Sequence, residues 1–514
     1  MRWLMLFGIA FLVACSSDRA GEGVATGNDA IIRLADADAR GLDPQTVSDL
    51  ASIRIAADQF EGLTRFDAKG NAEAGLAENW QITGEGRIWI FKLRDALFFS
   101  DGIPITADVF QKAITRIRDE KTGSPHVSLF SIINRIDTRG DREIIVHLDQ
   151  PFPQLPALLA HPAMAALPFH RLSEKGQSWT SERPLVTSGP YRLTDWRLAQ
   201  AITLEANPRW HGGAPMTRKI SWRPMENPQS GMRLMLSGGA DVSSNFPISR
   251  YSWLKKNHPE LIRVHDYLGS YYFAFNTRRT PFNDVRVRRA LSMAIDRKWI
   301  AKKMVAAGNA PEWGLLPAGL AGGEIYKPKW ANWPREERLS VARKILRKAG
   351  YGKAHPLSFE IRFNSSPEHR RAAVAMATMW REIGVDAKLL NSEASLHFDS
   401  LRRGDFDIAR SGWIADLPAP ENFLSVHTSD AGPQNYSGYN SSAYDTAVKL
   451  ALSMARPDAR LAKMRGAEAM LMDDMPILPV YYYTSRNLVQ PGIKGWSDNI
   501  SNVHPSRFLH KTAE

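Results

Sequence analysis

Apolar residues recur along this chain with two alternating spacings. Runs in which apolar residues follow one another or alternate with polar ones predict strands. Such runs lie at 30–34, 88–93, 144–148, 202–205, 271–276 and 359–363. A spacing of three or four residues between apolar positions predicts helices. Helices are therefore expected at 47–63, 285–296, 339–349 and 370–383. Because strands and helices alternate from one end to the other, we expect α/β lobes rather than a barrel or a bundle.

The start of the chain carries a different pattern. Arg2 precedes a short apolar run at 4–14. Such a run is typical of a secretory signal and too short to span a bilayer, which needs about 20 apolar residues. It ends in Leu-Val-Ala before Cys15, which resembles the lipobox of bacterial lipoproteins, in which the cysteine is acylated. We therefore expect a lipoprotein signal peptide at 1–14, lipidation at Cys15 and a flexible tether at 15–27. A plain signal peptide followed by an incidental cysteine remains the alternative.

Composition limits the class of protein further. The chain has 514 residues, of which 44% are hydrophobic and 23% charged, which suits a folded protein of roughly two to four domains. The formal net charge is +12, but the charges are dispersed over helix-like segments, so we expect solvated helix faces and no nucleic acid partner. The single cysteine excludes an internal disulfide, although we place the protein in the oxidising periplasm, lipid-anchored to a cell membrane.

Motifs of common enzymes and metal sites are missing from the sequence. The chain contains no GxSxG, HExxH or GxxxxGKS/T motif, and one cysteine cannot form a zinc ribbon or a CxxC site. His369 and His397 each lack a second potential ligand at helical spacing. We therefore predict no catalytic residue, no metal site and no cofactor. A hydrolase whose catalytic residues lie far apart in the sequence remains an alternative, because a motif search does not detect it.

Several motifs, in one order, resemble a known family. They lie at 77–80 (AENW), 89–94 (WIFKLR), 98–104 (FFSDGIP), 106–109 (TADV) and 281–297 (PFNDVRVRRALSMAIDR). Together they resemble the bacterial extracellular solute-binding proteins of family 5, which include the oligopeptide- and dipeptide-binding proteins. The resemblance covers about residues 30–512. Segments 412–416 and 479–483 look most like the periplasmic oligopeptide-binding members.

The resemblance implies an α/β fold of two lobes with an appended subdomain and a hinge of two chain crossings. Lobe I would combine 28–60, 188–268 and 484–514, with 61–187 as the appended subdomain, and lobe II would be 269–483. Members of the family capture a solute between closing lobes and deliver it to an ABC permease in the inner membrane. We therefore expect a monomeric carrier of short peptides that is not an enzyme.

A peptide ligand dictates which groups the site needs. A free peptide has an ammonium at one end and a carboxylate at the other, and burying either without a partner would cost on the order of several kcal/mol. The resemblance places Asp416 at the ammonium, and a carboxylate is the right acceptor for it. It places Arg410 and His369 at the carboxylate of shorter and longer peptides respectively. A structural ion pair between Arg410 and Asp416, and an ordinary surface histidine at 369, remain alternatives.

The peptide backbone needs partners as well, because an extended peptide can pair with a protein as an added strand. By the resemblance, these partners are Leu50 and Gly412 through main-chain groups, and Tyr272, Tyr483 and Asn435 through their side chains. Trp413 would form the wall of a side-chain pocket. On the sequence alone, Trp413, Tyr272 and Tyr483 are more consistent with ordinary core aromatics.

Some positions depart from the pattern of the family. Gly269 and Ile414 stand where oligopeptide-binding members have a disulfide pair, Ala274 replaces a pocket glutamate, and His126 replaces a contacting tyrosine. We therefore expect peptides of a different length or side-chain preference. A ligand of another kind, such as a murein peptide, a metal complex, haem or a sugar, remains the alternative.

Overall fold

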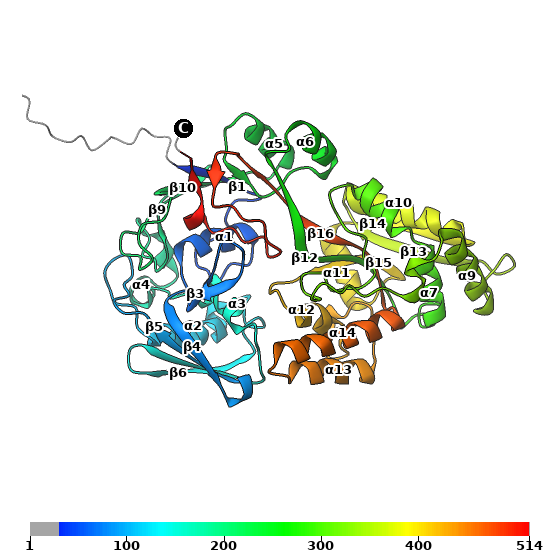
Figure 1. Cartoon of the computed structure of the whole chain (residues 1–514), viewed down its shortest axis with the longest axis horizontal. Helices are drawn as coiled ribbons and strands as arrows, with labels where there is room; N and C mark the ends of the chain where they lie inside the picture. The colour runs from blue at the N-terminus through cyan, green and yellow to red at the C-terminus, as the bar shows by residue number, and fades with distance from the viewer. Residues whose placement is uncertain (1–29, 513–514) are drawn as a thin grey trace, which may run out of the picture.

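The computed structural model describes residues 30–512 (Figure 1). The predicted signal peptide, Cys15 and the tether lie outside the described residues. The backbone forms a ten-stranded sheet, an antiparallel four-stranded sheet and two two-stranded ribbons, with helices packed around them. Within 30–512, no helix combines the length and apolar character needed to cross a bilayer. The mixture of strands and helices confirms the predicted α/β class.

Two long strands run through the middle of the ten-stranded sheet. β12 (Ile262–Phe275) and β16 (Ile477–Val489) pair antiparallel and connect the two halves of the molecule (Figure 1). On one side lie, in order, β11 (Val242–Ser243), β1 (Ile31–Ala35), β10 (Lys219–Pro224), β9 (Ala201–Ala206) and β8 (Tyr191–Arg197). On the other side lie β15 (Ile408–Ile414), β13 (Leu357–Asn364) and β14 (Val385–Ser392). The chain therefore crosses twice between two lobes, as the resemblance implied.

Helix α1 (Leu50–Gln59) of the first lobe is shorter than the predicted stretch 47–63. It begins at Leu50 because the Asp49 side chain accepts a hydrogen bond from Ser52 N at 2.9 Å and so caps the first turn. Ala51 and Ile55, one turn apart, pack in the core of the lobe. The opposite face of the helix is left free for other contacts. The lobe also contains α5 (Pro228–Leu236) and α6 (Tyr251–Asn257).

An antiparallel subdomain is appended to this lobe. Its sheet has the order β4 (Ala77–Thr83), β5 (Ile88–Leu93), β7 (Glu143–Leu148) and β6 (Ile133–Arg139). Its other elements are β2 (Thr64–Phe66), β3 (Ala72–Ala74), α2 (Asp108–Arg118), α3 (Leu155–Leu159) and α4 (Phe169–Lys175). Alternate residues of β7, namely Ile144, Val146 and Leu148, are buried, as expected of a strand with one face on the core.

The second lobe has a core on each face of its part of the sheet. Tyr271 and Phe273 of β12 pack in one core, and Tyr272 and Ala274 pack in the other, because successive side chains of a strand point to opposite faces. The first core contains residues of α7 (Val285–Ala294), α9 (Arg335–Lys348) and α10 (Pro367–Arg381). The second contains residues of α11 (Ala394–Arg403), α12 (Pro420–Leu424), α13 (Ser442–Leu452) and α14 (Pro457–Asp474).

The pairing of the two crossing strands is interrupted where they pass between the lobes. Asp266 pairs with Thr484 and Ser270 with Tyr482, so residues 267–269 of β12 oppose a single residue of β16. Such an irregularity lets a strand bend. Gly269 is needed at this point, because a Cβ atom there would lie 2.6 Å from Tyr483 Cδ2.

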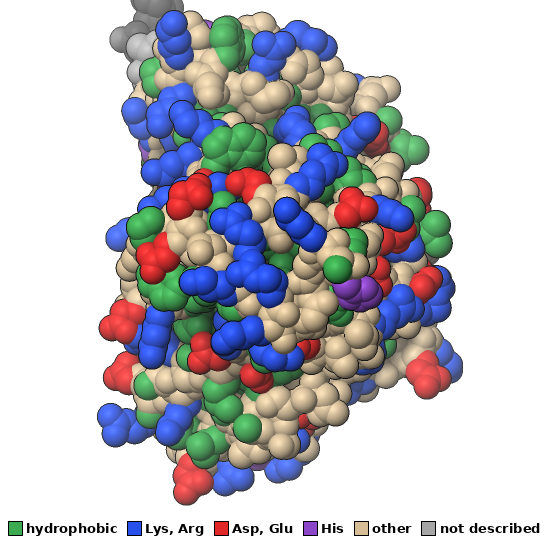
Figure 2. Space-filling model, turned by 90° about the vertical axis from the view of Figure 1, so that its right-hand side faces the viewer, with side chains coloured by type: hydrophobic (Ala, Val, Ile, Leu, Met, Phe, Trp, Pro, Cys, Tyr) green, Lys and Arg blue, Asp and Glu red, His purple; other side chains and the backbone are tan. Residues whose placement is uncertain are grey.

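Charged side chains are spread over the surface of the second lobe. Figure 2 shows the end of the molecule that carries α9, where Lys and Arg side chains are interspersed with acidic and apolar ones. This agrees with the expectation of solvated helix faces.

Candidate ligand-binding site

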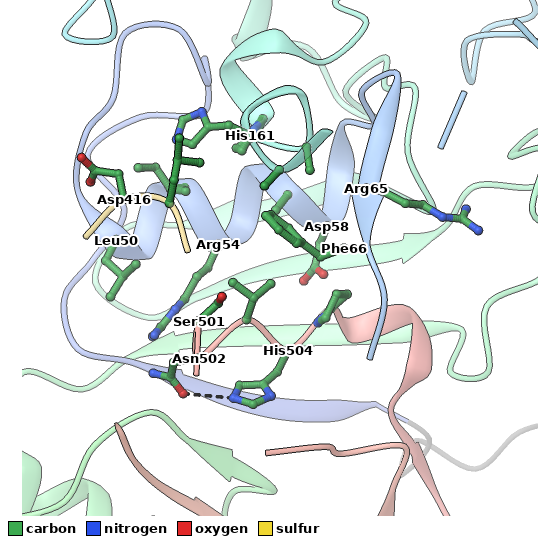
Figure 3. Close-up of a pocket in the computed structure, with 18 of the residues that line it drawn as sticks. Leu50, Arg54, Asp58, Arg65, Phe66, His161, Asp416, Ser501, Asn502 and His504 are labelled. Atoms are coloured by element: carbon green, nitrogen blue, oxygen red, sulfur yellow. Dashed lines mark hydrogen bonds between the residues drawn. The ribbon is translucent and has the colours of Figure 1, made fainter. Parts of the chain in front are cut away.

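A cavity of about 630 Å³ lies between the lobes (Figure 3). The first lobe contributes α1 and the segment 496–507, and the appended subdomain contributes residues around 125–129 and 157–162. The second lobe contributes residues 414–418, which follow β15. The interrupted part of β12 also lines the cavity, through Tyr267 and Leu268. A solute in this cavity would therefore touch both lobes and the connection between them.

Asp416 presents an unpaired carboxylate to this cavity. It lies two residues after the end of β15, and its side chain is exposed. No residue in the described part of the chain forms a hydrogen bond or an ion pair with its carboxylate. Desolvation raises the pKa of the Asp416 carboxyl above its usual value, and the nearby His126 ring lowers it in part. A carboxylate of this kind can accept hydrogen bonds from an ammonium group.

Asn422 holds the backbone on which Asp416 stands. Its side-chain oxygen accepts hydrogen bonds from Asp416 N at 3.2 Å and from the indole Nε1 of Trp413 at 3.3 Å. Trp413 packs against the second core of its lobe and does not line the 630 Å³ cavity. The sequence analysis missed Asn422, because nothing in its local pattern shows that it folds back onto residues 413–416.

Leu50 and Arg54 lie one turn apart on the face of α1 that lines the cavity (Figure 3). Leu50 is the first residue of the helix and is 49% exposed. The N–H groups in the first turn of a helix have no partner within the helix, so main-chain donors are present beside Leu50. The sequence analysis named Leu50 but missed Arg54, although their spacing of four residues on a helix puts them on one face.

Arg410 stands among tyrosines on the opposite face of the sheet from Tyr272. Its Nη2 donates to Tyr483 Oη at 2.7 Å, and its guanidinium carbon lies 5.0 Å from the centre of the Tyr271 ring. Its Nε is buried without a partner. Among residues 30–512, no carboxylate lies within ion-pair distance of it, so Arg410 and Asp416 are not a structural ion pair. Arg410 therefore keeps capacity for an added carboxylate.

His369 lies beside this arginine. Its Nδ1 is 3.2 Å from the Tyr271 hydroxyl. Burial lowers the pKa of His369 to about 3, and the charge of Arg410 lowers it further in the same direction. The ring is therefore neutral near pH 7, and one of its two nitrogens carries a proton. A neutral ring in this state can donate one hydrogen bond to a carboxylate.

Gly412 and Tyr483 meet at the point where β12, β15 and β16 come together. Gly412 pairs with Tyr271 in the ladder between β12 and β15. A Cβ atom at 412 would lie 2.9 Å from Ser270 O and 3.1 Å from Tyr483 Oη. Glycine therefore allows Tyr483 to approach the strand and reach Arg410.

Of the predicted ligand residues, Leu50 and Asp416 line the cavity, whereas Arg410, His369, Gly412, Tyr483, Tyr272 and Asn435 do not. Tyr272 is 3% exposed in the second core, edge-on to His427, which fits the core aromatic that the sequence also allowed. The Asn435 amide donates to the carbonyls of Thr428 and Tyr439, and its oxygen accepts from the Ser437 hydroxyl. In this conformation the hydrogen-bonding groups of Asn435 are already used within the lobe.

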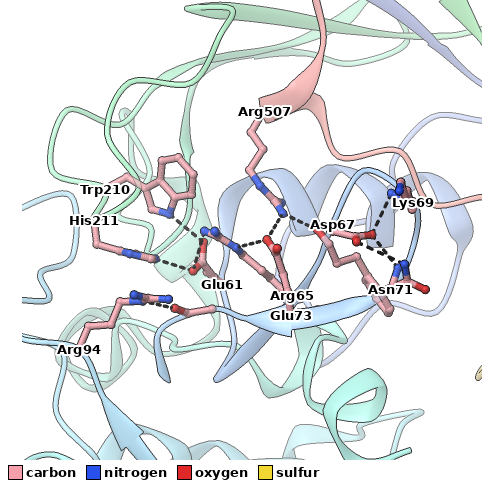
Figure 4. Close-up of polar contacts among 12 residues, drawn as sticks. Glu61, Arg65, Asp67, Lys69, Asn71, Glu73, Arg94, Trp210, His211 and Arg507 are labelled. Carbon is pink, nitrogen blue, oxygen red and sulfur yellow. Dashed lines mark hydrogen bonds and ion pairs between the residues drawn. The ribbon is translucent and has the colours of Figure 1, made fainter. Parts of the chain in front are cut away.

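Other acidic and basic groups near the cavity are paired with one another (Figure 4). Glu61 accepts from Trp210 Nε1 at 2.8 Å and from His211 Nε2 at 2.6 Å. Burial raises the pKa of the Glu61 carboxyl, but His211 and the neighbouring arginines lower it by more, so it stays below its usual value. Arg65 pairs with both Glu61 and Glu73. This network joins the appended subdomain to its lobe and leaves no free charge for a ligand.

A sheet shared by two lobes, with a cavity between them and an interrupted double connection, defines a solute-binding protein. The chain belongs to the bacterial extracellular solute-binding proteins of family 5, whose middle-region model matches residues 71–435. This confirms the family to which the sequence motifs pointed.

Its relatives include proteins of known ligand. The chain is 32% identical to the periplasmic oligopeptide-binding protein OppA of Salmonella typhimurium, over 92% of this chain and 91% of that protein. It is 33% identical to the periplasmic murein peptide-binding protein MppA of Escherichia coli, over 91% of this chain and 90% of that protein. Both relatives are periplasmic peptide-binding proteins by name.

Solved structures share the fold over nearly the whole chain. The unliganded open form of MppA has a TM-score of 0.84 and 30% identity, covering 95% of this chain and 98% of that one. Haemophilus influenzae OppA in complex with the peptide RPPGFSPFR has a TM-score of 0.78 and 28% identity, covering 95% of this chain and 100% of that one. The two-lobed fold is thereby shown.

Proposed function

We propose that this protein captures short peptides between its lobes and delivers them to an ABC permease in the inner membrane. The observation that carries the proposal is the unpaired carboxylate of Asp416, which faces the cavity between the lobes. A ligand with a free ammonium is its natural partner. The names of the relatives OppA and MppA support a peptide as that ligand.

The other end of the peptide would meet Arg410 or His369, according to its length. Arg410 has no acidic partner among the described residues, and a guanidinium binds a carboxylate through two parallel hydrogen bonds. Between the ends, the peptide would pair with main-chain groups at Leu50 and Gly412, beside Tyr483. Trp413 would form the wall of a side-chain pocket only after it moves away from the second core of its lobe. Tyr272 and Asn435 have the least support as ligand residues. Tyr272 is buried in the core of the second lobe, and the Asn435 amide forms its hydrogen bonds within that lobe.

Capture would require the lobes to close. We propose that lobe I is 28–60, 188–268 and 484–514, with 61–187 appended, and that lobe II is 269–483. The interruption of the β12–β16 ladder at 267–269 coincides with these boundaries and supports a hinge there. The higher TM-score with an unliganded open relative than with a peptide complex supports an open conformation for this structure. The exposure of the Asp416 side chain also supports an open conformation, because closure of the lobes would bury it.

Cellular placement is part of the same proposal. The protein would be a monomer in the periplasm, tethered to a membrane by acyl groups on Cys15. The pattern of residues 1–15 supports the tether, and the periplasmic relatives support the compartment.

A murein peptide is the second candidate ligand. MppA of Escherichia coli supports it, because that protein is named for this ligand and is as similar to the chain as the OppA proteins are. A murein peptide also carries a free ammonium in its stem, so the role of Asp416 would be unchanged.

The test compares peptides with free and blocked amino ends. Purified protein, freed of bound ligand by unfolding and refolding, is titrated with a tetra-alanine peptide and its N-acetylated form by calorimetry. Because a buried charge pair that loses one partner costs about 2–5 kcal/mol, we expect acetylation to weaken binding by roughly 30-fold or more. Asp416→Asn, which keeps the shape of the side chain, should weaken binding of the peptide with the free amino end to a similar degree. Equal binding of both peptides by the unmodified protein would show that Asp416 does not bind an ammonium.

A further inference from the structure

The cavity between the lobes contains a second unpaired charge besides Asp416. The Arg54 side chain extends from α1 into the cavity (Figure 3). Within residues 30–512 it has no hydrogen-bond or ion-pair partner. Desolvation lowers the pKa of the Arg54 guanidinium, and the more distant Asp36 opposes this only in part. Arg54 is therefore a half-buried cation that the folded chain has not neutralised.

The other arginines that line the cavity are already engaged. Arg33 donates to His504 O at 2.8 Å and to Ser506 Oγ at 2.6 Å, and it stacks on Trp222 at 4.2 Å. Arg65 pairs with Glu61 and Glu73, and Arg507 donates to Phe66 O and pairs with Glu73.

The remaining carboxylates at the cavity are engaged as well. Asp58 accepts hydrogen bonds from Trp222 Nε1 at 3.1 Å and from Ser506 Oγ at 2.6 Å, and Glu61 is held in the network of Figure 4. Among the carboxylates and arginines that line the described cavity, Asp416 and Arg54 therefore have no ion-pair or side-chain hydrogen-bond partner and are available to a ligand.

The two free charges line the same cavity from facing lobes. Tyr267, in the interrupted part of β12, is within electrostatic reach of both. Burial raises the pKa of its hydroxyl, Arg54 lowers it and Asp416 raises it. Arg54 and Asp416 form no ion pair with each other in this conformation. A ligand that binds there would meet an anion from one lobe and a cation from the other.

We propose that Arg54 binds an acidic side chain near the amino end of the peptide, while Asp416 binds its ammonium. This inference rests on the proposed function and names its substrate class. Closing the lobes around a peptide with neutral side chains would desolvate Arg54 without an anion, which is costly. A carboxylate side chain would supply two charge-assisted hydrogen bonds. The Ser501 hydroxyl, which lines the same cavity, is a further potential donor (Figure 3).

The acidic side chain is assigned to the first few residues of the peptide, because Leu50 and Arg54 line the same cavity as Asp416. Leu50, which is proposed to flank the peptide backbone, lies one helical turn, about 5.4 Å, from Arg54. An extended peptide advances about 3.3 Å per residue. The first three residues of the peptide are therefore the positions to test for an acidic side chain.

The experiment is a position scan by calorimetry. Tetra-alanine peptides with Glu or Gln at position 1, 2 or 3 are titrated into the unmodified protein and into Arg54→Gln. We expect Glu to bind at least tenfold more tightly than Gln at one position. Arg54→Gln should abolish this difference and change the affinity of the matching Gln peptide by less than about threefold. Arg54→Lys, which keeps the charge but not the planar fork, should retain part of the preference.

A matched control separates local from general charge effects. Arg197→Gln removes one exposed arginine of β8, which is paired with Asp195, and should leave the preference for Glu intact. The inference is overturned if no position prefers Glu, if the preference survives in Arg54→Gln, or if that variant weakens all peptides equally. In each of these cases peptides still bind and the proposed function stands. If the unmodified protein binds no peptide of either series, the proposed function fails and this inference fails with it.

Discussion

Single residues define this site through groups that the fold leaves without partners. Asp416 and Arg54 face the cavity unpaired, whereas Arg410 faces tyrosines that leave its Nε free. Burial also controls the histidines. His369 is neutral near pH 7 because burial lowers its pKa to about 3. Burial also lowers the pKa of His427, which lies in the second core of its lobe. This residue is 3% exposed, and both of its ring nitrogens are buried without a partner.

His427 should make stability depend on pH. Burial lowers the pKa of its imidazole to about 4 in the folded protein, whereas the ring has an ordinary pKa of about 6.5 when unfolded. Below pH 6.5 the unfolded chain therefore binds a proton that the folded chain does not, and the free energy of unfolding falls as the pH falls towards 4. His427→Phe removes this proton. The stability of the unmodified protein relative to the variant should fall by up to roughly 2 kcal/mol between pH 7 and pH 5.

Urea unfolding of both proteins at the two pH values measures this difference. Parallel pH profiles for the two proteins would show that the His427 ring is protonated in the folded state.

Among the elements, the crossing strands bring residues of distant segments to one place. β12, β15 and β16 pack so closely at 269 and 412 that only glycine fits beside Tyr483. Of these strands, only the second half of β12 was predicted, at 271–276, where the apolar run is continuous. Their pairing was not, because β16 follows β12 by about two hundred residues and no local pattern records which strands become neighbours. Helix α1 was predicted too long for a similar reason, since its start depends on the cap by Asp49.

A glycine pair tests this close packing. Gly269→Ala places a Cβ atom 2.6 Å from Tyr483 Cδ2, so we expect it to lower the free energy of unfolding by about 1–3 kcal/mol, the usual cost of overpacking. Gly466, within α14, has no heavy atom within 4 Å of an added Cβ. Gly466→Ala should therefore stabilise the protein by up to about 1 kcal/mol. Chemical unfolding measures both, and a neutral Gly269→Ala would show that Tyr483 moves aside easily.

In the whole molecule, the two lobes are joined by a sheet whose central ladder is interrupted between Asp266 and Ser270 and again between Tyr271 and Tyr272. Residues 267–269 lie between the core of the first lobe and the cores of the second, and Leu268 itself packs in one core of the second lobe. A ligand that touches 414–418 on one lobe and α1 on the other would stabilise the closed state through contacts that the open state lacks.

Closure should be visible in solution. Addition of a saturating peptide with a free amino end is expected to lower the radius of gyration measured by small-angle X-ray scattering, because the lobes approach each other. The N-acetylated peptide at the same concentration serves as the control and should leave the scattering unchanged. An identical radius of gyration with and without the bound free peptide would contradict a closing hinge at 267–269.

The sequence by itself determined the α/β class, the family and the existence of several of the longer strands and helices, since these depend on local periodicity and on motifs of fixed order. It also pointed to Asp416, through the resemblance of segment 412–416 to the oligopeptide-binding members of the family. Only the tertiary structure decided which charges are free. Arg54 lacks a partner, Asn422 accepts a hydrogen bond from Asp416 N, and the Asn435 amide forms its hydrogen bonds within its lobe. Each of these outcomes depends on how the chain packs in three dimensions. Burial and pairing are properties of the packed molecule, and no local pattern contains them.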